Sequence, residues 1–168
     1  AAGNLFGRAG GDGPCILGGS HIDTTLNAGP LDGVYGVLGA IEAVDRLGQS
    51  PGKPIEVLAL TAEEPRFSTG CLGSRALIGD LTPELTGRLS DRDGVTLAEA
   101  MRALSMDPDR LGEATLAPGH AELFVEMHIE QGAVLEKESR RIGVVNAIAA
   151  PHDLRLSLTG TAAHAGTT

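Results

Sequence analysis

The order of two short apolar runs and one amphipathic segment constrains the fold of this chain most strongly. Residues 15–19 and residues 55–60 each have the length of a buried strand, and polar side chains follow both directly. The segment between them carries apolar residues at helical spacing, namely Val37, Ala40, Ile41 and Val44. Gly48 provides a C-cap, so we predict a helix over residues 36–47. This strand, helix and strand indicate an α/β fold with a mostly parallel sheet.

A third apolar run, residues 123–127, also ends in polar side chains. His128 follows it, as His21 follows the first run and a Glu-Glu pair follows the second. In open α/β sheets, ligands bind beyond the carboxyl ends of the strands. We therefore expect three buried strands to aim polar groups at one edge of the sheet. Asp32 should lie near that edge, in the turn before the predicted helix.

The C-terminal part of the chain has strand-like patterns and a change of character. Residues 142–149 form an apolar run, and apolar residues alternate with polar ones over residues 154–159, as in a half-solvated strand. The change from one pattern to the other occurs near Pro151. We therefore predict a domain boundary there, with residues 1–150 in a first domain and residues 151–168 at the start of a second.

Composition argues against several classes of function. The 168 residues carry a net charge of -9 with three Phe, one Tyr and no Trp, so they lack the basic stripe and the stacking rings of nucleic-acid binders. No apolar run approaches the roughly 18 residues of a membrane span. We therefore expect neither nucleic acid nor a membrane as a partner. Cys15 and Cys71 lie far apart and give no disulfide framework, so we expect a cytoplasmic protein.

Each candidate functional residue also has an ordinary structural interpretation. His21 and Asp23 fit a metal-binding imidazole supported by a carboxylate, but a His-x-Asp triplet is more often a loop hydrogen bond. Asp32 fits a carboxylate shared by cations, or a solvated group at a helix N-terminus. Glu63 and Glu64 point to opposite sides of an extended backbone, so one can bind a metal while the other acts as a base. The same pair also fits a solvated acidic turn.

The convergence of these residues favours a metal site. His21, Asp32, Glu64 and His128 each follow, or lie just beyond, a predicted buried strand, although a solitary histidine such as His128 is often structural. Imidazole and carboxylate ligands together suit zinc, manganese or cobalt. Two other histidines have only loop context and are expected to be structural or solvated: His120 and His152.

Six short blocks distributed along the chain carry a family resemblance. The blocks are Gly19-Ser20-His21-Ile22-Asp23, Gly29-x-x-Asp32-Gly33-Val34-x-Gly36, Glu63-Glu64-Pro65-Arg66-Phe67, Cys71-Leu72-Gly73-Ser74-Arg75, His128-Ile129-Glu130-Gln131-Gly132 and Gly160-Thr161-Ala162-Ala163-His164-Ala165-Gly166-Thr167-Thr168. Together they resemble the amidase and carbamoylase branch of the di-metal M20 peptidase clan, which includes allantoate amidohydrolase, N-carbamoyl-L-amino-acid hydrolase and β-ureidopropionase. The His128 block is the most branch-specific, because related peptidases generally place an acidic ligand there.

The resemblance implies part of a zinc-peptidase-like catalytic domain, with helices around a mostly parallel sheet, and the first strand of a lid and dimerisation domain. It also implies two divalent metal ions, of zinc, manganese or cobalt. By position, His21, Asp32 and His128 hold one metal, and Asp32 bridges to a second metal held by Glu64. Asp23 supports the ring of His21.

The resemblance also assigns roles beyond the metals. Glu63 becomes the general base for a metal-bound water, and Gln131 and His164 match positions that contact the substrate. Family members are much longer, form dimers through the lid and take a further histidine for the second metal from near the C-terminus. We therefore expect this chain to be the N-terminal part of a homodimeric enzyme and to be inactive by itself.

The expected function is metal-dependent hydrolysis of linear C–N bonds in small N-carbamoyl or ureido compounds, such as N-carbamoyl-L-amino acids or allantoate. Two alternatives stay open: an aminoacylase or dipeptidase of the same clan, and a non-catalytic, degenerate domain that binds metal or dimerises. Relatives commonly have one more residue between the Glu-Glu pair and Arg66-Phe67, which keeps the second alternative open.

Overall fold

The computed structural model describes residues 2–48, 52–150, 154 and 156–167. The chain forms two compact units, Ala1–Gln131 and Gly132–Thr168. None of the helices in these described ranges has the length and apolarity needed to cross a membrane. The elements of the first unit are, in chain order, β1 (Leu5–Ala9), β2 (Cys15–His21), α1 (Val34–Leu47), β3 (Ile55–Leu60), α2 (Leu72–Leu77), α3 (Pro83–Thr86), α4 (Leu97–Ala103), the 3-10 helix η1 (Pro108–Ala114) and β4 (Ala121–Val125).

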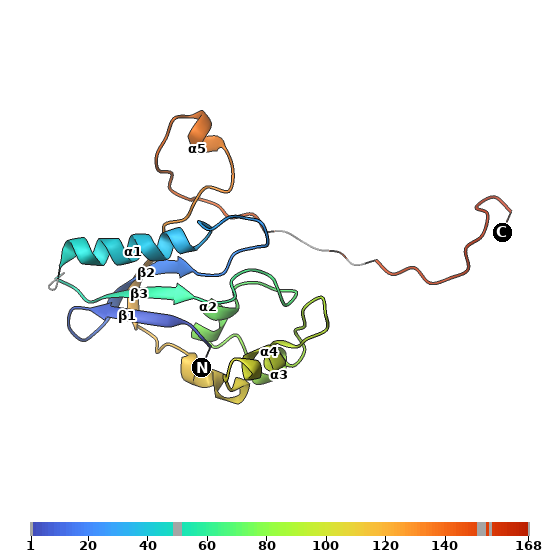
Figure 1. Cartoon of the computed structure of the whole chain (residues 1–168), viewed down its shortest axis with the longest axis horizontal. Helices are drawn as coiled ribbons and strands as arrows, with labels where there is room; N and C mark the ends of the chain where they lie inside the picture. Colours follow the sequence, from blue (N-terminus) through green and yellow to red (C-terminus); the bar gives the residue numbers. More distant parts are fainter. Residues whose placement is uncertain (1, 49–51, 151–153, 155, 168) are drawn as a thin grey trace. The chain divides into compact units, whose positions relative to one another are not determined.

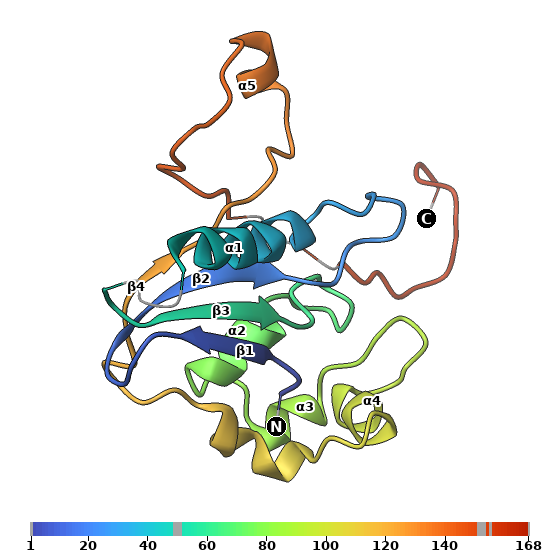
Figure 2. The same ribbon diagram turned by 60° about the vertical axis from the view of Figure 1, so that its left-hand side comes forward.

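The four strands form one mixed sheet in the order β1-β3-β2-β4 (Figure 2). β2 pairs in parallel with both β3 and β4, whereas β1 runs antiparallel to β3. The β2–β3 register brings His21, the last residue of β2, opposite Leu60, the last residue of β3. This confirms the predicted α/β class, the mostly parallel sheet and the strand over residues 55–60.

Helices cover both faces of this sheet (Figure 1), with α1 on one face and α2 to α4 and η1 on the other. Side chains alternate between the faces along β2. Gly18 faces α1, since a Cβ there would lie 3.5 Å from the Cβ of Ala40. The alternate residues face α2 and join one apolar cluster, made of Cys15, Leu17, Leu58, Leu60 and Leu77. The helices beyond α2 enclose a second cluster, made of Phe67, Leu72, Ala76, Leu81, Leu97, Met101 and Leu111.

The predicted helix over residues 36–47 is confirmed as α1, which begins two residues earlier. Its apolar face is narrower than predicted, because Val37 is buried but Ile41 is 50% exposed. Gly36 allows α1 to approach the end of β4 closely. A Cβ at Gly36 would lie only 2.2 Å from the carbonyl oxygen of Met127, so any larger residue would push the helix away.

The third predicted strand exists as β4, but the prediction that it is buried is wrong. Leu123, Phe124 and Val125 are 54%, 45% and 52% exposed. In the described part of the chain β4 pairs with β2 alone and forms an edge of the sheet. An edge strand buries less of its surface than a central one, so a continuous apolar run did not guarantee burial here.

A capping box begins α4. The Thr96 hydroxyl accepts a hydrogen bond from the backbone N–H of Glu99, at 3.2 Å. The Glu99 carboxylate accepts one from the backbone N–H of Thr96, at 2.8 Å. These reciprocal bonds satisfy two backbone donors and hold the N-terminus of α4, whose residues Leu97 and Met101 join the second apolar cluster.

The second unit contains α5 (Val134–Lys137) and has no strand among its described residues. The predicted strand over residues 142–149 is therefore wrong, and residues 154 and 156–159 are not in a strand either. A strand needs a hydrogen-bonded neighbour, and nothing in the described chain pairs with these segments. Residues 151–153 and 155, including His152, lie outside the described residues. The domain boundary near Pro151 and the lid domain stay predictions.

Candidate metal centre

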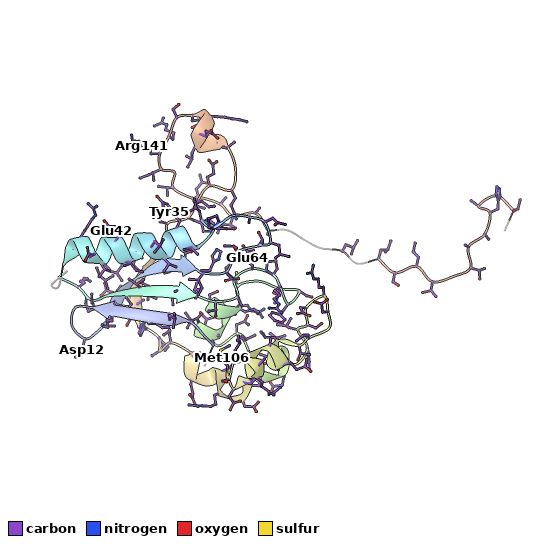
Figure 3. All side chains as sticks on the ribbon, viewed as in Figure 1. Asp12, Tyr35, Glu42, Glu64, Met106 and Arg141 are labelled. Carbon is purple, nitrogen blue, oxygen red and sulfur yellow. The ribbon has the colours of Figure 1, made fainter. Side chains whose placement is uncertain are left out.

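The predicted site residues of the first unit lie at the carboxyl edge of the parallel strands. His21 ends β2, Glu63 and Glu64 follow β3, and His128 follows β4. Figure 3 shows Glu64 at this edge, with Asp12 at the opposite end of the sheet. Asp32 lies directly before the residue that caps α1. Parallel pairing therefore places side chains from four separate segments next to one another, as the strand pattern predicted.

Three of these side chains form a compact group that could hold a metal ion. The Nε2 atoms of His21 and His128 lie 3.4 Å apart. The nearest Asp32 oxygen, Oδ1, lies 3.2 Å from the His128 nitrogen and 4.0 Å from the His21 nitrogen. His21 and Asp32 are almost fully buried, whereas the side chain of His128 is partly exposed. Two imidazoles and one carboxylate aimed at one point make a donor set that suits zinc, manganese or cobalt.

The two consecutive glutamates form a second group with His21. One carboxylate oxygen of each lies within 4.8 Å of the other and of a ring nitrogen of His21. Burial raises the pKa of the Glu64 carboxyl above its ordinary value, and the nearby carboxylates of Glu63 and Asp32 raise it further. A divalent cation would relieve this repulsion, so the charges as well as the donor atoms fit a metal.

Asp23 positions both groups. Its carboxylate accepts hydrogen bonds from the backbone N–H groups of Glu63, at 3.1 Å, and Glu64, at 2.9 Å. The Nδ1 atom of His21 lies 2.7 Å from the main-chain carbonyl oxygen of Asp23, much closer than the 3.9 Å to its carboxylate. A ring N–H bonded to this carbonyl leaves Nε2 of His21 facing the candidate metal position.

The two predicted substrate-binding residues lie in different units. The side-chain amide of Gln131 lies 3.3 Å and 3.2 Å from the two carboxylate oxygens of Asp32 and donates to them, which places Gln131 at the candidate metal centre. His164 belongs to the second unit, where its Nδ1 atom accepts a hydrogen bond from the backbone N–H of Gly166. The contact of either residue with a substrate stays a prediction.

Two side-chain contacts near the site were not predicted from the sequence. The Ser20 hydroxyl donates a hydrogen bond to the carboxylate of Glu126. Glu126 lies two positions before His128, and residues with this spacing share one side of an extended segment, so the pattern held a usable signal. The Cys71 thiol lies 3.4 Å from a carboxylate oxygen of Glu63 and donates to it. No sequence pattern indicates this contact, because it depends on how the loop after β3 returns to the sheet.

The sequence pattern of peptidase family M20/M25/M40 matches residues 19–165 of this chain. The chain belongs to this family. Membership implies a metal-dependent hydrolase, which agrees with the two groups of ligand side chains in the first unit of this M20 chain.

Relatives confirm the resemblance to the amidase and carbamoylase branch. An N-carbamoyl-L-amino acid amidohydrolase of Geobacillus stearothermophilus is 45% identical, covering 100% of this chain and 42% of the relative. A ureidoglycolate hydrolase of Arabidopsis thaliana is 43% identical, covering 99% of this chain and 37% of the relative. The chain thus spans about two fifths of the length of these curated relatives.

Solved structures support the same relationship. The crystal structure of AtUAH in complex with (S)-hydroxyglycine matches with a TM-score of 0.71 and 40% identity, covering 83% of this M20 chain and 36% of that one. A hydantoinase/carbamoylase family amidase from Burkholderia ambifaria matches with a TM-score of 0.66 and 39% identity, covering 83% of this chain and 34% of that one. The sheet and helices described above are therefore part of the fold of these amidases.

Proposed function

We propose that the complete protein is a metal-dependent amidohydrolase that cleaves a linear C–N bond in an N-carbamoyl or ureido compound. The observation that carries the proposal is the meeting of His21, Asp32 and His128 with the Glu63–Glu64 pair at one edge of the sheet. The relatives support the substrate class, since their names include N-carbamoyl-L-amino acid amidohydrolase, ureidoglycolate hydrolase and allantoate amidohydrolase.

Two divalent cations fit the ligand side chains. We assign one to His21, Asp32 and His128, and we assign a second to Asp32 and Glu64 with a further ligand from elsewhere in the complete protein. When bound, such ions polarise the carbonyl that is attacked and lower the pKa of a neighbouring water. Their charge would also offset the repulsion of Glu64 by the carboxylates of Glu63 and Asp32, which adds to burial in raising the pKa of Glu64.

Glu63 is the proposed general base. It takes a proton from the attacking water and later returns that proton to the departing nitrogen. Its carboxylate is partly exposed and reaches the centre, 4.0 Å from Nε2 of His21. The hydrogen bond from its backbone N–H to Asp23 and the thiol contact of Cys71 hold the residue in place. Preorganisation of this kind keeps the base within reach of the water without reordering the loop.

Gln131 is a proposed substrate contact. Its amide now donates to the two Asp32 oxygens that we assign to the metals. Once those oxygens bind cations, the amide of Gln131 is free to donate to a carbonyl or carboxylate of the substrate. We propose His164 as a second contact, on the basis of the family motif around it.

The test compares Glu63→Gln with Glu64→Gln in the complete gene product. A general base typically contributes a factor of about 10² to 10⁴, so Glu63→Gln should lower turnover by at least about 10² while keeping the metal content. Glu64→Gln should lose metal, because an amide is a poorer ligand than a carboxylate. Elemental analysis and steady-state kinetics measure both effects. A Glu63 variant that loses metal, together with a Glu64 variant that retains it, would reverse the assignment.

A substrate panel separates the proposed class from its alternatives. The proposal expects ammonia release from N-carbamoyl-L-amino acids, allantoate or ureidoglycolate. Faster turnover of N-acyl amino acids or dipeptides would instead identify an aminoacylase or dipeptidase. Stoichiometric metal without turnover of any of these compounds would identify a non-catalytic domain. A homodimer and a cytoplasmic location are further proposals, which size measurement and cell fractionation can check.

A further inference from the structure

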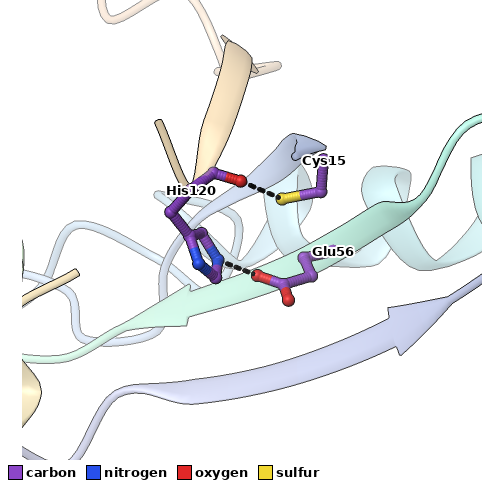
Figure 4. A group of neighbouring side chains, drawn as sticks. All are labelled: Cys15, Glu56 and His120. Atoms are coloured by element: carbon purple, nitrogen blue, oxygen red, sulfur yellow. Dashed lines mark hydrogen bonds and ion pairs between the residues drawn. The ribbon is translucent and has the colours of Figure 1, made fainter. Parts of the chain in front are cut away.

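A separate cluster of metal-ligand side chains lies at the amino ends of the parallel strands, at the opposite end of these strands from His21 and His128. Cys15 begins β2, Glu56 is the second residue of β3, and His120 directly precedes β4 (Figure 4). Because these three strands are parallel, their amino ends meet at one edge just as their carboxyl ends meet at the other. The same topology that assembles the candidate metal centre therefore assembles a cysteine, a glutamate and a histidine at the opposite edge.

Glu56 is unusual because it is a carboxylate buried on the α2 side of the sheet. It shares that side of β3 with Leu58 and Leu60, and its side chain is only 8% exposed. A buried carboxylate is costly unless charged partners or a metal compensate for the lost water. One oxygen, Oε1, accepts a hydrogen bond from the Arg8 guanidinium at 2.7 Å. The other, Oε2, lies 2.6 Å from Nε2 of His120.

Backbone contacts fix Cys15 beside His120. The carbonyl oxygen of His120 accepts a hydrogen bond from the backbone N–H of Cys15, at 3.0 Å, and lies 3.4 Å from its sulfur. The register between β2 and β4 then shifts, so that Cys15 pairs with Ala121 while Ile16 pairs with Leu123. Irregularities of this kind re-aim side chains and are common beside functional sites. The thiol and the imidazole are thus brought together by the backbone, before any ligand binds.

The ligand atoms are close to the spacing that zinc requires. The Cys15 sulfur, a Glu56 carboxylate oxygen and a His120 ring nitrogen all lie within 4.8 Å of one another. Zinc binds sulfur at about 2.3 Å and nitrogen or oxygen at about 2.1 Å, which separates tetrahedral ligand atoms by roughly 3.3 to 3.7 Å. The 2.6 Å between Nε2 of His120 and Oε2 of Glu56 is shorter than this separation, so the two side chains must move slightly apart when zinc binds between them.

We propose that Cys15, Glu56 and His120 bind a zinc ion, with Arg8 holding the second oxygen of the carboxylate. A thiolate ligand favours zinc over magnesium or manganese, which distinguishes this site from the oxygen-rich carboxyl edge. The Cys15 thiol releases its proton to solvent on binding, and the imidazole binds in its neutral form. Water takes the fourth position from the side where His120 is partly exposed. The ion would tie together the amino ends of three strands and stabilise the folded chain.

Cobalt(II) provides a direct test, because a cobalt–thiolate bond produces a charge-transfer absorption that imidazole and carboxylate ligands do not. The reduced 168-residue chain is titrated with Co²⁺ in a phosphine reductant and then with Zn²⁺. The expected result is a saturable near-ultraviolet charge-transfer band that an excess of Zn²⁺ removes. Cys15→Ser should abolish the band. His120→Gln should weaken cobalt binding at least tenfold. Because His120 is partly exposed, this variant still tests the site if Cys15→Ser, at a buried position, does not fold.

Two matched variants exclude the candidate metal centre as the source of the signal. Cys71→Ser removes the thiol beside Glu63, and Asp32→Asn weakens that centre, so the charge-transfer band should survive both. A wild-type chain without the band, or a band that disappears in Cys71→Ser, would refute the site. A band of unchanged intensity and midpoint in His120→Gln would also refute it. In the first two cases the cluster is an ion-pair network of Arg8, Glu56 and His120 without a metal, and in the third His120 is not a ligand.

Discussion

Replacing Gly33 with alanine tests whether the close approach of α1 to β2 sets the position of His21. Gly33 caps the N-terminus of α1 with φ 69° and ψ -55°. A Cβ there would lie 2.4 Å from Nδ1 and 2.5 Å from Cε1 of His21. The side chain of His21 is 5% exposed, so the ring cannot move aside into solvent. The turn therefore needs glycine for two separate reasons, a backbone conformation that alanine adopts poorly and the absence of a side chain against the ring.

The size of the effect follows from these two terms. A non-glycine residue in a sparsely populated backbone region costs about 1 to 3 kcal/mol, and overpacking a buried contact costs about 1 to 3 kcal/mol more. Gly33→Ala should thus lower the free energy of unfolding by roughly 2 to 6 kcal/mol. Because relief of the clash displaces the ring, divalent-metal affinity should fall by about 10- to 100-fold, the usual loss when the groups that support a ligand are disturbed.

Urea unfolding followed by circular dichroism measures the first quantity, and calorimetric titration with Zn²⁺ or Mn²⁺ measures the second. Gly112→Ala is the matched control, since Gly112 lies in η1 and no atom would come within 4 Å of its Cβ. That variant should match wild type within about 1 kcal/mol or be slightly more stable. Wild-type stability together with wild-type metal affinity in Gly33→Ala would show that the reasoning about this contact is wrong.

Three further substitutions test other parts of the structure. Asp23→Ala in the complete protein removes the carboxylate that accepts hydrogen bonds from the backbone N–H groups of Glu63 and Glu64, and should lower turnover about 10- to 100-fold. Asp23→Asn should recover part of this turnover, and steady-state rates of the two variants test both expectations. Thr96→Ala should cost about 1 kcal/mol in urea unfolding through loss of the capping box, and no change would contradict it. Burial acts to raise the pKa of Glu56, but hydrogen bonds and charges of His120 and Arg8 lower it below its ordinary 4.5. Its stabilising effect is then present above pH 4.5 and lost as pH falls through the lowered pKa, so Glu56→Gln should flatten the acid side of the melting-temperature profile measured with chelator.

The carboxyl edge of the sheet was predictable because each of its residues follows a local pattern. In a parallel sheet every strand ends on the same side, so polar residues that directly follow apolar runs are predicted to lie close together. His21, Asp32 and His128 meet there although the chain separates His21 from His128 by most of the first unit. Their roles as ligands remain predictions, but their proximity required only strand order and direction.

The second unit shows where local pattern is insufficient. Residues 142–149 have the composition of a strand, but side chains such as Val144 and Ile148 are 92% and 88% exposed. Alternation or apolar character describes how a strand would bury its faces if it had neighbours. The pattern carries no information about whether a neighbour exists, and the described residues supply none. β4 illustrates the same limit less severely, because one partner suffices to form the strand but not to bury it.

The cluster at the amino ends of the parallel strands was not predicted from the sequence. In the run over residues 55–60, Glu56 is the only charged residue, and the apolar character of its neighbours concealed it. A buried carboxylate in a strand requires a compensating group. Arg8 and His120 can be recognised as these groups only once β1 is placed beside β3 and β4 beside β2. Cys15 needs no such compensation, since a thiol packs well in an apolar cluster. Its presence within reach of Glu56 and His120 is therefore not explained by ion pairing, and this residue is what turns the cluster from a buried salt bridge into a candidate zinc site.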